Sequence, residues 1–149
     1  MWSSSSVALA VVEQDGVIDN IFVAPRVHEA VGGVVLLTMV IATVWTARSA
    51  LRGQSVGTSG RIVLIAAQVA LMVQALIGIK LLDQGLGVAQ LYIHYVGGLI
   101  PLGLFVGAGW VAWTDPVKRA RVTAVLSTLG LLSAGMAFVI GRAYVQGAI

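Results

Sequence analysis

Four long runs of apolar residues constrain the fold of this chain more than any other feature. They cover approximately residues 27–47, 62–82, 88–113 and 122–140. About 20 apolar residues in a helix cross the hydrocarbon core of a bilayer, so each run is long enough to span a membrane. The composition agrees, since 58% of the residues are hydrophobic and 10% are charged, and the mean hydropathy is +0.97. These values lie outside the range of soluble globular proteins.

The predicted fold is therefore an all-α integral membrane protein. Short connections between the runs favour a four-transmembrane-helix antiparallel bundle, residues 27–149. Residues 1–26 are mixed in character and are expected to form an exposed or interfacial N-terminal arm. Pro25 suits the first turn of the first helix, and Asp115 followed by Pro116 predicts the capped start of the fourth.

The basic residues indicate how the bundle is oriented. Six stand in the first and third connections or at the adjoining helix ends: Arg48, Arg52, Arg61, Lys118, Arg119 and Arg121. Three stand at the opposite ends: Arg26, Lys80 and Arg142. By the positive-inside rule both termini are expected on the non-cytoplasmic side, as in a multi-pass protein of a bacterial inner membrane. No basic run is interleaved with aromatic residues, so nucleic acid is not expected as a partner.

The two histidines of the chain occur in nearly the same setting. His28 and His94 each stand shortly after the start of an apolar run, and a glycine pair follows about one helical turn later. These pairs are Gly32-Gly33 and Gly97-Gly98. The first and third runs cross the membrane in the same direction, so both imidazoles are expected near the outer surface. Two neutral imidazoles on facing helices can ligate haem iron from both sides.

Other residues fit a haem placed between the histidines. Each glycine pair would let a flat porphyrin approach the backbone, although close helix packing explains such pairs equally well. Arg26, Lys80 and Arg142 fall at the same end, where they would meet the haem propionates or extend to the aqueous surface. The second run also carries two amides, Gln68 and Gln74, which project about 120° apart around a helix. At least one is expected to face the bundle interior.

Other cofactors fit less well. The chain has no cysteine and no third histidine, so a zinc or copper site would lack ligands. A chlorophyll-type pigment needs one axial imidazole and remains an alternative to haem b.

Two segments resemble one four-helix half of the heme A synthase family. They are His28-Glu-Ala-Val-Gly-Gly and the stretch from Val73-Gln-Ala-Leu-Ile-Gly to Leu91-Tyr-Ile-His94. In that family a histidine at the outer end of one helix, a Gln-Ala-Leu-Leu-Gly-like segment on the next and a second histidine on the third face a haem. The resemblance covers about residues 27–105, and it implies that His28 and His94 are the ligands and that residues 74–78 form the intervening motif.

The sequence also departs from that family. Pro25 stands where the substrate-handling half has an acidic residue, and Glu29 stands where it usually has a basic one. The cysteine-bearing loop is absent, and only one half is present. The resemblance thus implies the haem-binding bundle rather than the oxidative chemistry, and an enzyme is not favoured.

The sequence predicts a membrane protein with one b-type haem for electron transfer, or a haem-bearing subunit of a respiratory or photosynthetic complex. Such a role requires membrane lipid and a redox partner or a larger membrane complex. One alternative is a structural or pigment-binding accessory subunit. Another is a half-size relative of heme A synthase that acts as a homodimer.

Overall fold

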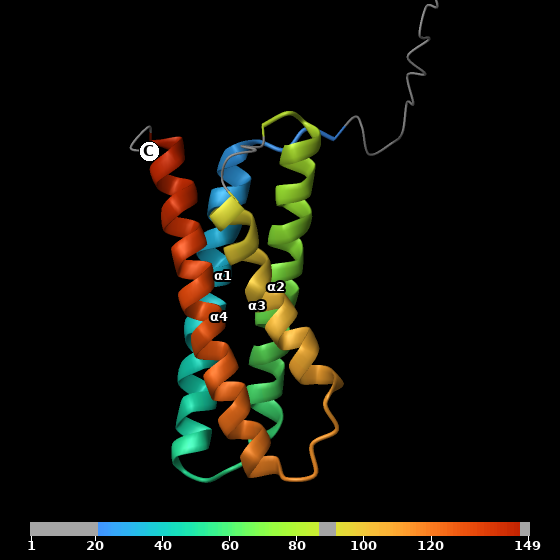
Figure 1. Cartoon of the computed structure of the whole chain (residues 1–149), viewed down its shortest axis with the longest axis vertical. Helices are drawn as coiled ribbons and strands as arrows, with labels where there is room; N and C mark the ends of the chain where they lie inside the picture. Colours follow the sequence, from blue (N-terminus) through green and yellow to red (C-terminus); the bar gives the residue numbers. More distant parts are fainter. Residues whose placement is uncertain (1–20, 87–91, 147–149) are drawn as a thin grey trace, which may run out of the picture.

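Four α-helices make up the described part of the chain. The computed structural model describes residues 21–86 and 92–146, and the regular elements in these ranges are all helical. The helices are α1 (Pro25–Leu51), α2 (Gly57–Asp83), α3 (Tyr92–Trp110) and α4 (Pro116–Val145) (Figure 1). Each is long and apolar enough to cross a membrane. The prediction of an all-α, multi-pass membrane protein with four spanning helices is confirmed.

Three of the helices extend beyond the apolar runs that predicted them. α1, α2 and α4 include polar turns at both ends, because a helix can continue into the polar layer after it leaves the hydrocarbon core. α3 instead ends at Trp110, before the predicted end at Trp113, whose indole N–H donates to the Ala108 carbonyl (3.1 Å). Residues 88–91 of the third run, and residues 1–20 of the N-terminal arm, lie outside the described residues.

The starts of α1 and α4 follow the predicted signals. Pro25 stands in the first turn of α1, where its missing N–H removes no helical hydrogen bond. Asp115 caps α4, since its Oδ1 accepts from the backbone N–H of Val117 (2.8 Å) and of Lys118 (3.1 Å). These two donors stabilise the carboxylate and hold the pKa of Asp115 below its usual value. Both predicted helix starts are therefore confirmed.

Consecutive helices are joined at alternating ends of the bundle (Figure 1). The segment before α1 is fastened to the turn after α2 by two hydrogen bonds. The Val23 N–H donates to Gln84 Oε1 (2.7 Å), and Gln84 Nε2 donates to the Val23 carbonyl (2.9 Å). The starts of α1 and α3 lie at the same end as the ends of α2 and α4. The histidine-bearing turns of α1 and α3 therefore share one end of the bundle.

α4 packs closely along both α1 and α3, whereas α2 and α3 touch least among the neighbouring pairs. The buried face of α4 carries small residues: Ala120, Ala124, Ser127, Gly130, Ala134 and Ala137. Small side chains let helix backbones approach closely in a membrane. Two interhelical hydrogen bonds reinforce this packing. Thr43 Oγ1 donates to the Ser127 carbonyl (3.1 Å), and Ser133 Oγ donates to the Gly97 carbonyl (2.8 Å).

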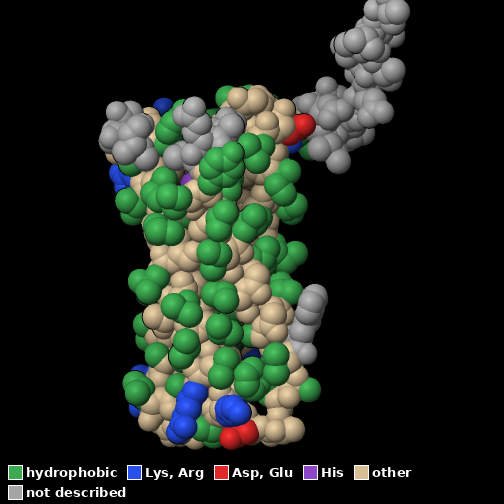
Figure 2. All heavy atoms as spheres, viewed as in Figure 1, with side chains coloured by type: hydrophobic (Ala, Val, Ile, Leu, Met, Phe, Trp, Pro, Cys, Tyr) green, Lys and Arg blue, Asp and Glu red, His purple; other side chains and the backbone are tan. Residues whose placement is uncertain are grey.

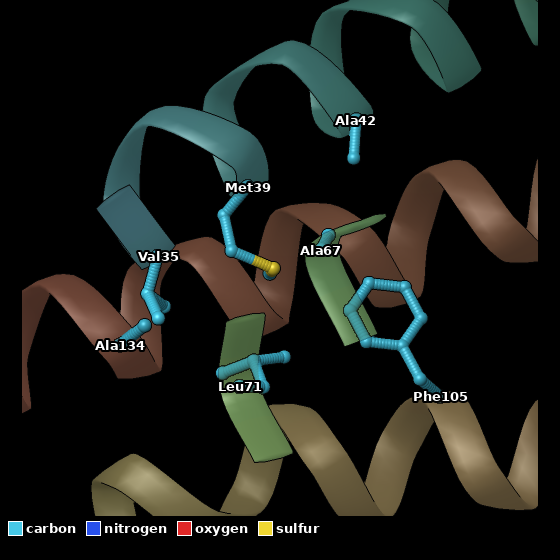
Figure 3. Packing of buried hydrophobic residues seen from close by; sticks show 7 residues of the cluster. All are labelled: Val35, Met39, Ala42, Ala67, Leu71, Phe105 and Ala134. Atoms are coloured by element: carbon cyan, nitrogen blue, oxygen red, sulfur yellow. The ribbon is translucent and has the colours of Figure 1, made fainter. Parts of the chain in front are cut away.

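All four helices contribute to one buried apolar cluster in the middle of the bundle (Figure 3). Its members are Val35, Met39, Ala42, Ala67, Leu71, Phe105 and Ala134. Met39 is fully buried, and Gly130 makes room for it, because a Cβ at Gly130 would lie 2.9 Å from the Met39 methyl carbon. This cluster separates the histidine end of the bundle from the end with six basic residues.

On the face shown in Figure 2, the surface is apolar along the length of the bundle, and the charged side chains gather at its ends. Exposed hydrophobic residues occur on every helix, among them Leu37, Leu76, Ile93 and Leu132. A soluble protein rarely exposes so large a continuous apolar surface. Lipid is the solvent that this surface suits.

Candidate functional site

The two histidines lie side by side at one end of the bundle. His28 comes from the first turns of α1 and His94 from the first turn of α3, and both residues are half-buried. Their ring centroids are 6.0 Å apart, and the ring planes are inclined at 62°. The structure thus brings together the two residues that the sequence singles out as ligands.

Contacts with α4 hold the ring of His94 in place. Its Nδ1 lies 2.8 Å from the Ala137 carbonyl oxygen, and a carbonyl only accepts, so Nδ1 carries the proton and Nε2 carries the lone pair. The ring also lies over Gly141, where a Cβ would come within 2.8 Å of His94 Cε1 and 2.9 Å of Nδ1. Atoms do not approach so closely without displacement. A side chain at position 141 would therefore move the imidazole.

The ring of His28 is supported from α2 in a similar way. Its Nε2 lies 3.1 Å from Gln74 Nε2, and a Cβ at Gly78 would lie 3.3 Å from His28 Cε1. Gln74 therefore faces the interior, as expected for at least one of the two amides on α2. In the described part of the chain, His28 Nδ1 and Gln74 Oε1 are buried without a hydrogen-bond partner.

His28 and His94 are held by the same kind of contacts. In each case a histidine in the first turns of one helix packs against a glycine near the end of the next helix in the chain. One turn before that glycine, a polar group meets the imidazole: the Gln74 amide for His28 and the Ala137 carbonyl for His94. Each ring is thereby held in one position by two contacts from a neighbouring helix.

The predicted glycine pairs divide into packed and open positions. A Cβ at Gly32 would lie 3.1 Å from the Phe138 ring and 3.3 Å from Gln74 Nε2. A Cβ at Gly97 would lie 3.4 Å from both Ala137 Cβ and the Ser133 carbonyl oxygen. At Gly33 and Gly98 a Cβ would meet nothing within 4 Å. One member of each pair thus serves helix packing, and their contact with a cofactor stays a prediction.

The three cations expected near the propionates are at this end of the bundle, but two have carboxylate neighbours. Arg142 Nε lies 4.0 Å from Glu29 Oε1, and Lys80 Nζ pairs with Asp83. Arg26 is exposed. Glu29 is thus an exposed carboxylate beside a cation. A role of these cations toward propionates also stays a prediction.

The donor set at this end consists of two imidazoles. Among the residues that the structure describes, no three His, Cys, Asp or Glu side chains come together to hold a metal ion. The Tyr95 ring lies near His94, with centroids 5.6 Å apart. An apolar surface hollow of about 230 Å³ flanks this region, lined by Tyr92, Ile93, Val96, Gly97, Ile100 and Met136. The described residues thus place two imidazoles next to an apolar surface.

Comparisons of the chain with models of known families, with curated proteins and with solved structures find no match. The resemblance to heme A synthase therefore stays a prediction drawn from the motifs quoted above.

Sequence reasoning missed part of the site. Gly141 was not singled out, and Gly78 was noted only as the end of a motif. A signal existed, since an isoleucine precedes each of these glycines and each follows its histidine at a similar distance. The Ala137 carbonyl had no such signal, because every residue carries a backbone carbonyl.

Proposed function

We propose that this protein is a multi-pass membrane b-type haem protein for electron transfer, with His28 and His94 as the two axial ligands. The observation that carries the proposal is the 6.0 Å separation of the two ring centroids. With about 2 Å from metal to imidazole nitrogen and about 1.1 Å from that nitrogen to the ring centroid, two imidazoles on opposite sides of one metal have centroids about 6 Å apart. The 6.0 Å between the two ring centroids is close to this value.

The surroundings of the rings support ligation. His94 donates Nδ1–H to the Ala137 carbonyl, which is the usual arrangement of a ligating histidine because it fixes the ring and raises the basicity of Nε2. Gly141 and Gly78 admit the two rings close to α4 and α2. The buried setting and the nearby cations would tune the reduction potential of the iron.

His28 and His94 would together hold the iron and would leave no open position for oxygen or a substrate. A haem held by these two residues would supply one-electron chemistry there, so electron transfer is favoured over catalysis at the metal. A haem near one end of the bundle cannot by itself carry an electron across the membrane. The proposed function therefore includes a redox partner, either a protein or a quinol, or membership of a larger respiratory or photosynthetic complex.

The proposed orientation places the histidines near the outer surface. In an antiparallel bundle with both termini on the non-cytoplasmic side, the six basic residues at the opposite end would face the cytoplasm. The membrane would then be a bacterial inner membrane. Labelling of single cysteines introduced at Gln146 and at Gln54 with a membrane-impermeant reagent in intact cells tests this orientation, since only the former should react.

The test of the haem proposal is a reduced-minus-oxidised absorption spectrum of the protein purified from its native membrane. Wild-type protein is expected to give a low-spin b-type spectrum. His28→Ala and His94→Ala are each expected to abolish it or convert it to a high-spin form. Gly135→Ala is a control on α4, because a Cβ there would meet nothing within 4 Å and the position has no part in the proposed site, so it should leave the spectrum unchanged.

Other spectra would lead to other functions. A chlorin spectrum would favour the pigment-binding alternative, and turnover of a modified haem would favour the homodimeric enzyme. Absence of any macrocycle from protein purified with its membrane partners would refute the haem proposal and leave the structural accessory subunit as the better account.

A further inference from the structure

We propose that Gln74 is a positioning residue that occupies the coordinating nitrogen of His28 until a haem takes its place. This inference rests on the proposed haem ligation, and it assigns to Gln74 a role in the ligand-free protein. The side chain holds His28 in the tautomer that can ligate, and its amide must leave Nε2 before a metal can bind there.

The hydrogen bond with Gln74 determines which nitrogen of His28 carries the ring proton. Gln74 Nε2 lies 3.1 Å from His28 Nε2, and an amide nitrogen only donates. His28 Nε2 must then be the acceptor, so the ring proton resides on Nδ1. His94 is in the same state, because its Nδ1 donates to the Ala137 carbonyl (2.8 Å). Both imidazoles thus carry their lone pairs on Nε2.

The polar partners of the two imidazoles stand at different ring nitrogens. The polar partner of His94 stands at Nδ1, behind the coordinating nitrogen, and does not compete with a metal. The partner of His28 stands at Nε2 itself. A neutral amide at this position satisfies the lone pair in an apolar setting, where an unpaired polar atom is costly. It also blocks one of the two ligands.

The Gln74 amide is closely packed but only partly hydrogen-bonded. Gly32 lies against it, since a Cβ there would come within 3.3 Å of Gln74 Nε2. The amide is nevertheless only partly satisfied, because Gln74 Oε1 and His28 Nδ1 are both buried without a hydrogen-bond partner in the described ranges. A half-satisfied buried polar pair is a weak arrangement. One hydrogen bond must break on ligation, and no complete network has to be dismantled.

The test compares haem binding by Gln74→Leu with binding by wild-type protein. Each ligand-free protein, reconstituted in lipid nanodiscs, is titrated with haemin and followed by absorbance. Gln74→Leu has no amide to displace and should bind haem about fivefold more tightly, which corresponds to the net contribution of one hydrogen bond, about 1 kcal/mol. Gln68→Leu is the matched control, because it removes the other amide of α2, and it should leave the affinity unchanged. Weaker binding by Gln74→Leu would overturn the inference.

A measurement on the wild-type protein alone keeps the inference testable if Gln74→Leu fails to fold. Nitrogen-15 chemical shifts of the imidazoles in ligand-free protein report which nitrogen of each ring is protonated. The expected result is protonated Nδ1 and unprotonated Nε2 for both His28 and His94. Normal haem binding by a protein whose His28 is protonated on Nε2 would overturn the role of Gln74 alone. Absence of haem binding by wild-type protein would overturn the proposed function together with it.

Discussion

Gly141→Ala is the substitution that tests the site most directly, because it changes one methyl group at a position that touches an imidazole. The added Cβ would lie 2.8 Å from His94 Cε1 and 2.9 Å from His94 Nδ1. Carbon atoms in contact are normally about 3.5–4.0 Å apart, so the ring must move by roughly 0.7 Å or more. Ligand distances at a metal site tolerate only about 0.2 Å. The 2.8 Å hydrogen bond from His94 to the Ala137 carbonyl would be strained or lost.

Two effects of this substitution can be separated. Alanine raises helix propensity over glycine by up to about 1 kcal/mol, and the lost hydrogen bond lowers stability by about the same amount. The melting temperature of the ligand-free protein should therefore change little. Haem affinity should fall by roughly 10–100-fold, the usual effect of disturbing a group that orients a metal ligand. Thermal unfolding and a haemin titration measure the two quantities.

The control for Gly141→Ala is Gly135→Ala, on the same helix. A Cβ at Gly135 would meet nothing within 4 Å, so this variant should bind haem with wild-type affinity. If Gly141→Ala also bound haem as the wild type does, the close approach of His94 to α4 would have no part in ligation. The proposed position of the haem would then be wrong.

Two further predictions concern the scaffold. Met39→Ala leaves a cavity in the central cluster and should lower the free energy of unfolding in detergent by about 2 kcal/mol or more, measured by denaturant or thermal unfolding; an unchanged stability would mean that the cluster collapses around the smaller side chain. The pKa of Asp115 is lower in the folded state than in the unfolded state. The Asp115 carboxylate therefore stabilises α4 fully at any pH above the unfolded pKa of about 3.9. This stabilisation is lost as the pH falls through the lower folded pKa. The protection factor of the Val117 amide against hydrogen exchange should fall over that acidic range in wild-type protein and should be low at every pH in Asp115→Ala.

The fold was largely predictable because it depends on composition over long windows. Runs of about 20 apolar residues leave few alternatives to spanning helices, since the backbone must satisfy its own hydrogen bonds in lipid. The level of the histidines was also predictable, because each follows the start of a run and alternate helices begin at the same end. The helix ends were less predictable, since α1 and α4 continue through polar residues that the apolar pattern does not register.

The contacts behind the imidazoles were not predictable from local patterns. The glycine pairs that follow the histidines in sequence were predicted to lie at the site. The glycines that pack against the imidazole rings, Gly78 and Gly141, instead lie on other helices. Which glycine faces which ring depends on how the helices pack and rotate against one another. The partner of His94 is a backbone carbonyl, and its accessibility likewise depends on tertiary structure.

The pair of hydrogen bonds between Val23 and Gln84 has a mechanical consequence. Val23 leads into the helix that carries His28, and Gln84 directly follows the helix that carries Gln74. Because the two bonds fasten these segments together at their polar ends, a pull on the chain ahead of Val23 is shared between α1 and α2. Sliding of α1 past α2 at this end would have to break both bonds, so they help to keep His28 and Gln74 within reach of each other.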